Sequence, residues 1–474
     1  MKKWLTWILL LFGIPTLCLA QSLEEVIRLA QDSVITAFQS QYEYEYYQER
    51  HEQFEALRKP QLDLSVVPNY MRMISDLSRD YIYQRNYDRF STAADIKLTQ
   101  KVLGWGGEAY VGTRAIWSEY LGQDVLHGRT RDYVVAPVIV GYQQPLLGYN
   151  VYRWEKAVED ERLEAARKQH AYELHLIAEE ATRRFFRLAC AQEFLDMCAR
   201  NKQTADTLYA IAREKASIAM VSLAELRSLE LERLNAANAL LNARNEEQLA
   251  RESLQAYLRL DEDSRLLDSR LTVPVQTKML PLSEEDALRM ARANSPALQQ
   301  KQVALTEARH QQEKARREAG VKVGVDLNVG MQQFGSAVGI ERYNPQFYMM
   351  GGVTFSVPLM DHGAARKGFS AASAWKAREE QALKEEERAL DEDVRTTLEN
   401  LRSLQQMLTH TSEAVSMADD VFQLTADNYA NGLCDIDAYS LAQNRRDQAY
   451  NQHLTALANY WITYYHLLTL TQYE

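Results

Sequence analysis

The stretch "YQQPLLGYNVYRWEKA", residues 142–157, changes character at its proline. Before Pro145 the chain alternates in the manner of a strand, and after it the pattern becomes helical. A second stretch, "FSVPLMDHGAARKGFS" at residues 355–370, makes the same change at Pro358. Proline suits this place because it cannot donate to a strand ladder and is tolerated in the first turn of a helix. Two such strand-to-helix turns predict a chain built from two repeats.

The segments around these turns also occur twice, in the same order. "SLEEVIRLAQDS" begins at Ser22 and "LSEEDALRMARANSP" at Leu282, and each predicts a helix with a serine cap and an acidic first turn. We expect each to be one helix that runs to a basic cluster, "ALRKP" from Ala56 in the first copy and "KARREAG" from Lys314 in the second. Further on, "ASIAMVSLAELRSLELERLNAANALL" from Ala216 corresponds to "ANGLCDIDAYSLAQNRRDQAYNQHLTAL" from Ala430. Because a repeat of this kind defines an architecture, both halves should share one structural plan.

The N-terminus has the pattern of a secretory signal peptide, in which two lysines precede an apolar run and a small residue. We expect cleavage between Ala20 and Gln21. Cys18 would suggest a lipoprotein, but Leu17 stands where a lipobox carries a small residue, so we expect no lipid. The chain then divides into a signal peptide at 1–20, a first repeat at 21–260, a linker at 261–280 and a second repeat at 281–474.

Composition excludes several classes of protein. The 474 residues carry a net charge of −11 without a long basic run, which argues against a nucleic-acid partner. After the signal peptide no segment approaches 18 consecutive apolar residues, so we expect no transmembrane helix, and an exported protein remains periplasmic, secreted or a β-barrel.

Cys190 and Cys198 would lie about 12 Å apart on one helix, too far to bridge. We expect these two and Cys434 to be inert thiols.

Two very long helices are expected, at 151–216 and 364–431, followed by shorter ones at 222–260 and 437–471. About 65 helical residues span roughly 100 Å, which no compact domain accommodates. Apolar residues recur every seven positions in both, which predicts left-handed supercoiling in a bundle or tube. These positions are Leu174, Ala181, Leu188 and Leu195 in the first, and Val394, Leu401, Leu408, Val415, Phe422 and Tyr429 in the second.

Six segments predict strands of nearly the length that a tilted strand needs to cross a bilayer. Ala30 and Ala291 are 261 positions apart, whereas the two prolines are 213 apart, so the first repeat carries about 48 additional residues. We expect these to form an extra hairpin with its turn at Gly104–Gly107, which would either enlarge a barrel or extend its wall. The six segments are 61–71, 91–103, 107–118, 133–145, 321–333 and 346–358.

The paired openings "LEEVIRLA" and "EEDALRMA", the paired turns "QPLLGYN" and "VPLMDHG", and the paired segments "AMVSLAELRSLE" and "NGLCDIDAYSLAQ" together resemble the TolC-like outer-membrane efflux proteins. The resemblance runs from Ser22 to about Leu470. It implies a mainly α fold with a membrane β-barrel, in which a homotrimer forms a tunnel of long coiled-coil-like helices. That tunnel would join a shared outer-membrane barrel of twelve strands, four from each subunit.

The resemblance also implies a function and a place in the cell. Such a protein is the outer-membrane channel of a tripartite efflux or type I secretion system, and receives substrates from an inner-membrane pump through a periplasmic adaptor. It would lie in outer-membrane lipid with its tunnel in the periplasm. Pro145 and Pro358 would mark where strands become tunnel wall. Drugs, metals, lipids and secreted proteins all remain open as the exported substrate.

The tunnel entrance in that family lies at the turns between long and shorter helices. The family often places aspartates six and nine positions after a turn glycine, but counted from Gly432 neither position is acidic here. Asp435 and Asp437 are the nearest acids, and the first repeat offers Glu225. We expect an acidic entrance ring of these residues, with ordinary helix capping by aspartate as the alternative.

An enzyme and a structural protein are the two alternative classes of function. No HExxH, CxxC, Walker or GxSxG motif is present, so we expect no enzyme, no catalytic residue, no cofactor and no metal site. A secreted or periplasmic coiled-coil structural protein or adhesin would explain the heptads and the signal peptide. It would leave the strands of bilayer length in both repeats unexplained.

Overall fold

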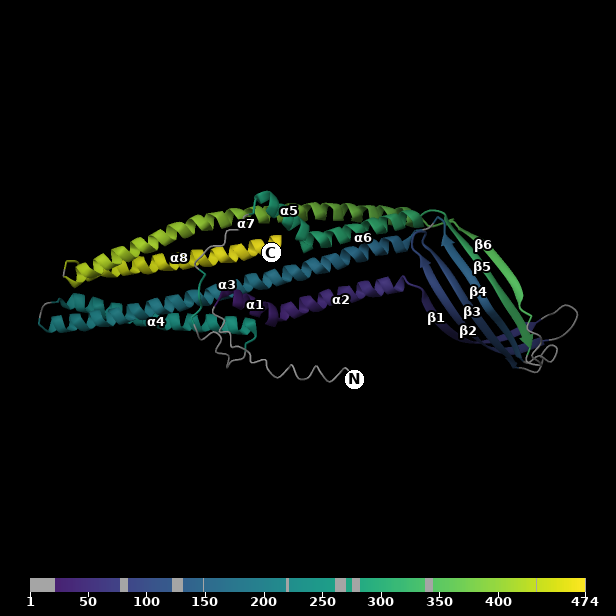
Figure 1. Ribbon diagram of the computed structural model, residues 1–474, viewed down its shortest axis with the longest axis horizontal. Helices are drawn as coiled ribbons and strands as arrows, with labels where there is room; N and C mark the ends of the chain where they lie inside the picture. The colour runs from purple at the N-terminus through teal and green to yellow at the C-terminus, as the bar shows by residue number, and fades with distance from the viewer. Residues whose placement is uncertain are drawn as a thin grey trace, which may run out of the picture. The chain divides into compact units, whose positions relative to one another are not determined.

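The computed structural model describes residues 22–76, 84–121, 131–147, 149–218, 221–260, 270–274, 282–336, 344–431 and 433–473. The predicted signal peptide and Gly432 lie outside these residues. Two compact units are present, one of residues 1–44, 166–296 and 386–474, the other of residues 45–165 and 297–385. In both repeats a pair of helices is followed by strands, a very long helix and a shorter helix (Figure 1).

A single antiparallel sheet lies in the second unit, with its strands in the order in which they occur in the chain (Figure 1). Every predicted strand is present, and most extend a few residues beyond the expected bounds. The first repeat supplies four and the second repeat two. The strands are β1 (Gln61–Asp76), β2 (Gln84–Val102), β3 (Gly107–Leu121), β4 (Arg131–Pro145), β5 (Lys322–Ser336) and β6 (Gln346–Ser356).

The additional residues of the first repeat form the predicted hairpin. Strands β2 and β3 pair from Asp88 opposite Leu121 to Val102 opposite Gly107, and a tight turn joins them. Gly106 has φ +77°, a conformation that glycine adopts without strain, and its N–H donates to the Val102 carbonyl over 2.9 Å. The sheet continues through this hairpin without interruption.

The helix that opens each repeat is broken in two, so our expectation of one continuous helix is wrong. In the second repeat α5 (Glu284–Asn294) gives way to α6 (Pro296–Glu318), and Ser295 between them has ψ 119° and is not helical, because proline disfavours a helical residue before it. The first repeat breaks at Val34, between α1 (Leu23–Ser33) and α2 (Ile35–Leu57), although no proline follows. The same kink is therefore kept at corresponding positions by different sequences.

The predicted helix starts are capped as their sequences suggest. Ser22 Oγ accepts from the Glu25 N–H over 3.3 Å, while Glu25 Oε2 accepts from the Ser22 N–H over 3.2 Å. This reciprocal capping box satisfies two N–H groups that the helix leaves free. Ser283 caps α5 by accepting from the Asp286 N–H over 3.1 Å.

The long helices are α3 (Val151–Ser217) and α7 (Ala364–Ala430), and the shorter ones are α4 (Leu223–Leu258) and α8 (Ile436–Thr471). All four agree with the predicted bounds within two residues. Their central heptad positions face inward, since Ala181, Leu188, Val394, Leu401 and Leu408 are all buried in one core cluster. In the described part of the chain, no helix is sufficiently long and apolar to cross a membrane.

The core of the first unit joins helices from both repeats. Leu23, Phe185, Leu254 and Trp461 are each almost completely buried and belong to one cluster. Part of the segment expected to be a linker also belongs to this core. Leu271 is buried there, and the Pro274 carbonyl accepts from Trp461 Nε1 over 3.1 Å. The link between the repeats thus contributes to packing as well as connecting them.

Replacing Trp461 should destabilise the first unit strongly. The side chain is 1% exposed, and removing a buried aromatic ring costs about 3–5 kcal/mol. We expect Trp461→Ala to lower the thermal unfolding midpoint of the purified protein clearly, and Trp461→Phe, which keeps most of the buried volume, to lower it much less. Equal midpoints for both variants would show that packing at this position does not support the unit.

Candidate functional site

The sheet has one apolar and one polar face. Side chains alternate between the faces along each strand, and the register shows which residues of different strands lie on the same side. The apolar residues of one face are exposed, such as Leu64 at 69% and Phe355 at 70%. They occur on all six strands: Leu62, Leu64, Val66, Ile96, Leu98, Val111, Ala115, Val138, Val140, Leu327, Val329, Met331, Phe347, Met349, Val353 and Phe355.

Aromatic side chains border this apolar face. Phe90 and Trp117 make an edge-to-face contact with centroids 6.4 Å apart, and Trp117 lies opposite Tyr133. Tyr142 lies nine residues along the same strand and, because of a register shift after Val135, on the same face. Nine residues span about 30 Å along a strand, or about 21 Å at a tilt near 45°. This approaches the ~25 Å height of the apolar band on an outer-membrane barrel.

Charged side chains occupy the opposite face. Asp95 and Arg114 lie directly opposite each other on β2 and β3 and form an ion pair. Lys97 lies opposite Asp63 of β1, and its Nζ is 4.0 Å above the ring centre of Tyr110. Because an exposed charge in the middle of a bilayer costs about 2–4 kcal/mol, this face fits water and the other fits lipid.

One tyrosine on the polar face links strands from both repeats. Tyr110 of β3 lies opposite Gly141 of β4, and Gly141 lies opposite Asn328 of β5. The tyrosine hydroxyl donates across β4 to Asn328 Oδ1 over 2.5 Å. A Cβ atom on Gly141 would lie 2.2 Å from the tyrosine ring, so only glycine leaves room for this contact. This contact was not predicted from the sequence, although a glycine inside a strand often marks such a close approach.

The first proline turn is tied to the additional hairpin. Strand β4 ends at Pro145, and the Leu146 N–H donates to the Val323 carbonyl of β5 over 2.8 Å. Asn150, just before α3, accepts from the Arg153 N–H through Oδ1 over 3.3 Å. Its Nδ2 donates to the Leu103 carbonyl in the β2–β3 turn over 3.0 Å. One side chain thus caps the long helix and fixes the hairpin turn.

The second proline turn uses a carboxylate instead. Strand β6 ends two residues before Pro358, and α7 begins after a turn in which Gly363 has φ +83°. Asp361 accepts from the N–H groups of Gly363 over 2.9 Å and of Ala365 over 3.0 Å. These backbone donors lower the pKa of the Asp361 carboxyl group. In both turns a side chain accepts hydrogen bonds from backbone N–H groups at the start of the long helix, but the residue is Asn150 in the first turn and Asp361 in the second.

The predicted entrance residues occupy the first turns of α4 and α8. Asp435 accepts from the Ala438 N–H over 2.9 Å and so caps α8, the role named as the alternative. Asp437 is exposed in the first turn of that helix. Ser222 caps α4 by accepting from the Glu225 N–H over 3.1 Å.

A small core joins these two helix starts. Leu229 of α4 and Ile436 and Tyr439 of α8 are buried together, with Phe422 and Tyr429 of α7 packed against them. Burial raises the pKa of the Tyr429 phenol, and the Glu225 carboxylate raises it further. The structure therefore brings acids of both repeats beside one hydrophobic cluster, which we call the tip core.

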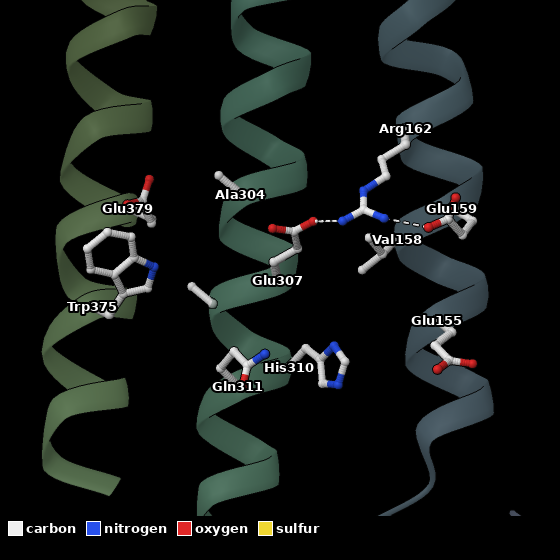
Figure 2. Close-up of a pocket in the computed structure, with 11 residues that line it drawn as sticks. Glu155, Val158, Glu159, Arg162, Ala304, Glu307, His310, Gln311, Trp375 and Glu379 are labelled. Carbon is white, nitrogen blue, oxygen red and sulfur yellow. Dashed lines mark hydrogen bonds and ion pairs between the residues drawn. The ribbon is translucent and has the colours of Figure 1, made fainter. Parts of the chain in front are cut away.

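A pocket between α3, α6 and α7 is lined by several charged residues (Figure 2). Arg162 forms two ion pairs. Its Nη1 lies 2.5 Å from Glu159 Oε1, and its Nη2 contacts Glu307 Oε1 of the second repeat. His310 stacks on Trp154 with centroids 5.8 Å apart, and burial lowers its pKa. Among the described residues, no group of three or more His, Cys, Asp or Glu is arranged to hold a metal. The charged network connects helices of the two repeats.

The three cysteines of the expected mature chain are free thiols, as predicted. Burial raises the pKa of the Cys190 thiol to about 11 and also raises that of Cys198. Because the thiolate is the reactive form, both are poor nucleophiles near neutral pH.

Comparison with known proteins agrees with this arrangement. Residues 287–471 match the family model "Outer membrane efflux protein", which confirms the resemblance for the second repeat. No curated protein matches the chain. The matched family is one of channels, not of enzymes.

Solved structures of bacterial outer membrane proteins share the fold. The Campylobacter jejuni outer membrane channel CmeC is 12% identical with a TM-score of 0.67, over 95% of this chain and 85% of that chain. VceC from Vibrio cholerae is 13% identical with a TM-score of 0.66, over 95% of this chain and 96% of that chain. MtrE from Neisseria gonorrhoeae is 14% identical with a TM-score of 0.64, over 95% and 88%. The family match thus covers the second repeat, and the common fold extends over 95% of the chain.

A side chain at Gly141 should disturb the contact between Tyr110 and Asn328. We expect Gly141→Ala to lower the thermal stability of the sheet by about 1–3 kcal/mol, because an added methyl group overlaps a packed ring. Gly324→Ala is the matched control, since no atom lies within 4 Å of its added Cβ. Adding Tyr110→Ala to Gly141→Ala should remove most of the overlap. If Gly141→Ala costs as much thermal stability in the Tyr110→Ala background as in the unaltered protein, the packing of Tyr110 over Gly141 is contradicted.

Proposed function

We propose that this chain is the outer-membrane exit duct of a tripartite efflux or type I secretion system and works as a homotrimer. The observation that carries the proposal is the six-stranded sheet whose exposed apolar face extends over every strand. A large apolar surface of this kind needs a membrane or a partner to cover it. The aromatic border and the charges on the opposite face favour lipid on one side and water on the other.

Closure of the sheet supports assembly from several copies. Among the described residues, β1 and β6 are edge strands, each paired on one side. Unpaired backbone groups in lipid cost several kcal/mol each, so a sheet inserted in a bilayer must close on itself. Six strands are too few to surround a tunnel, and the edges of neighbouring copies supply the missing pairs. The trimer is the assembly that the family resemblance implies.

The helix tips are the proposed docking end for the periplasmic adaptor and inner-membrane pump. Helix α3 leads from the Pro145 turn to the turn before α4, and α7 leads from the Pro358 turn to the turn before α8. At these tips Leu223 is 71% and Leu433 is 75% exposed. Exposed leucines beside the tip core give an adaptor an apolar contact, while the neighbouring acids surround the entrance.

Localisation and conductance test the proposed function. We expect the full-length protein in the outer-membrane fraction of its cell, and we expect the purified protein to form ion-conducting pores in planar lipid bilayers. An affinity-tagged copy should retain an adaptor and a pump after mild cross-linking. A protein that fractionates as water-soluble and forms no pores would overturn the proposal and favour a coiled-coil structural protein.

The acids at the tip of α8 should govern ion selection at the entrance. Converging carboxylates attract cations, so we expect Asp435→Asn with Asp437→Asn to reduce cation selectivity and weaken block by divalent cations. Asparagine is as good a helix cap as aspartate, so the fold should persist. Asp361→Asn removes one charge from the Pro358 turn and is the control. Selectivity and block equal to those of the unaltered channel would exclude these two residues from the gate.

A further inference from the structure

We propose that three copies of this chain close a barrel of eighteen strands, in which β1 of each copy pairs with β6 of the next. The number follows from six strands in each copy, multiplied by three. This proposal rests on the exit-duct function and adds the size of its pore. The family resemblance implies only twelve strands, so the additional hairpin must be shown to belong to the wall.

The register shows that the additional strands are part of the sheet itself. Strand β2 pairs with β1 over 16 residue pairs, from Gln61 opposite Thr99 to Asp76 opposite Gln84. Strand β3 pairs with β4 from Glu108 opposite Gln143 to Glu119 opposite Arg131. A plug folded into the lumen would have to leave this ladder. The hairpin instead lies between neighbours on both sides.

The length and apolar surface of the hairpin show that it crosses the lipid. Strands β2 and β3 have 19 and 15 residues, whereas a tilted strand needs about 9–11 to span a bilayer. Ile96 and Leu98 of β2 and Val111 of β3 continue the apolar face and are 42–48% exposed. A hairpin that only lengthened the wall into water would leave these side chains in solvent without cover.

The charges of the hairpin point to the lumen. Lys97 stands between Ile96 and Leu98 in the sequence, and therefore on the opposite face. Asp95 and Arg114 lie on that same face and pair with each other. A barrel that includes β2 and β3 thus adds lipid-facing apolar residues outside and paired charges inside. This is the alternation expected of a barrel wall.

The parity of the strands allows closure. Neighbouring strands are antiparallel throughout, so β1 and β6 run in opposite directions. When β6 of one copy meets β1 of the next, the new pair is also antiparallel. Leu62 and Leu64 on one edge and Val353 and Phe355 on the other then continue the apolar face. The occupant of each edge is therefore a second copy of this chain.

The consequence is a wider pore. Barrel diameter grows roughly in proportion to strand number, so eighteen strands give a diameter about 1.5 times that of twelve. Barrels of 16–18 strands leave an open aqueous channel. The barrel therefore admits bulkier cargo than a twelve-stranded one, and its lumen is lined by the paired charges of the added strands.

Labelling of neighbouring residues tests whether the hairpin lies in the wall. In proteoliposomes we expect Lys97→Cys to react with a water-soluble maleimide and Ile96→Cys to be at least tenfold slower. Arg114→Cys and Ala115→Cys repeat the comparison on β3. The unaltered protein, whose Cys190 and Cys198 thiols have raised pKa values, gives the background. Similar reaction of both neighbours would place the hairpin in water and overturn the proposal.

Cross-linking between edge strands tests the number of copies and strands. Cysteine is introduced on β6 at Val353 and, in separate variants, on β1 at Leu62, Leu64 or Val66. We expect oxidation of one such double variant to give a covalent trimer, while the single variants stay uncross-linked. Electron microscopy of the same trimer should show eighteen strands in cross-section. Covalent dimers without trimers, a disulfide within one copy, or a twelve-stranded barrel would overturn the proposal. Absence of any pore in bilayers would instead overturn the proposed function.

Discussion

The rest of this structure depends on one constraint, that backbone N–H and C=O groups need hydrogen-bond partners wherever water is absent. Strands β2 to β5 meet it within the chain, since each has a neighbour on both sides. Strands β1 and β6 meet it on one side only. In the proposed position of the sheet, with its apolar face in lipid, water cannot supply the missing partners of these edges. The proposed assembly from several copies therefore answers a need of the backbone, before any side chain at an interface is considered.

Separation of the two faces depends on small adjustments of register. The shift between Val135 and Val138 changes which residues of β4 face the apolar side, and so keeps Tyr133 and Tyr142 on one surface. Glycines in the sheet also leave space for large aromatic rings of neighbouring strands. Tyr110 lies over Gly141, and Tyr133 lies close to Gly335, where a Cβ would be 2.0 Å from its ring. Aromatic side chains can then lie across neighbouring strands without forcing the sheet apart.

The sequence was sufficient for the strands, the long and shorter helices and their order. Heptads predicted the long helices, alternation predicted all six strands, and the glycines around Gly104 predicted the hairpin turn. The break at Val34 was not predictable because no proline or glycine marks it, whereas Pro296 could have revealed its counterpart. The contact of Tyr110 with Asn328 depends on the register of three strands, which alternation alone does not specify. The role of Asp435 was ambiguous because capping and lining an entrance favour the same residue.

Strands β2 and β3 form a hairpin with its turn between Val102 and Gly107, so β3 ends at the same end of the sheet at which β2 began. Helix α3 begins at the end of the sheet where α2 stops, so a single added strand would leave the chain at the opposite end of the sheet. Insertions into this wall can therefore occur only two strands at a time. In a threefold assembly each such insertion is multiplied to six strands. Pores built on this plan can widen during evolution only in large discrete steps, with no intermediate diameters.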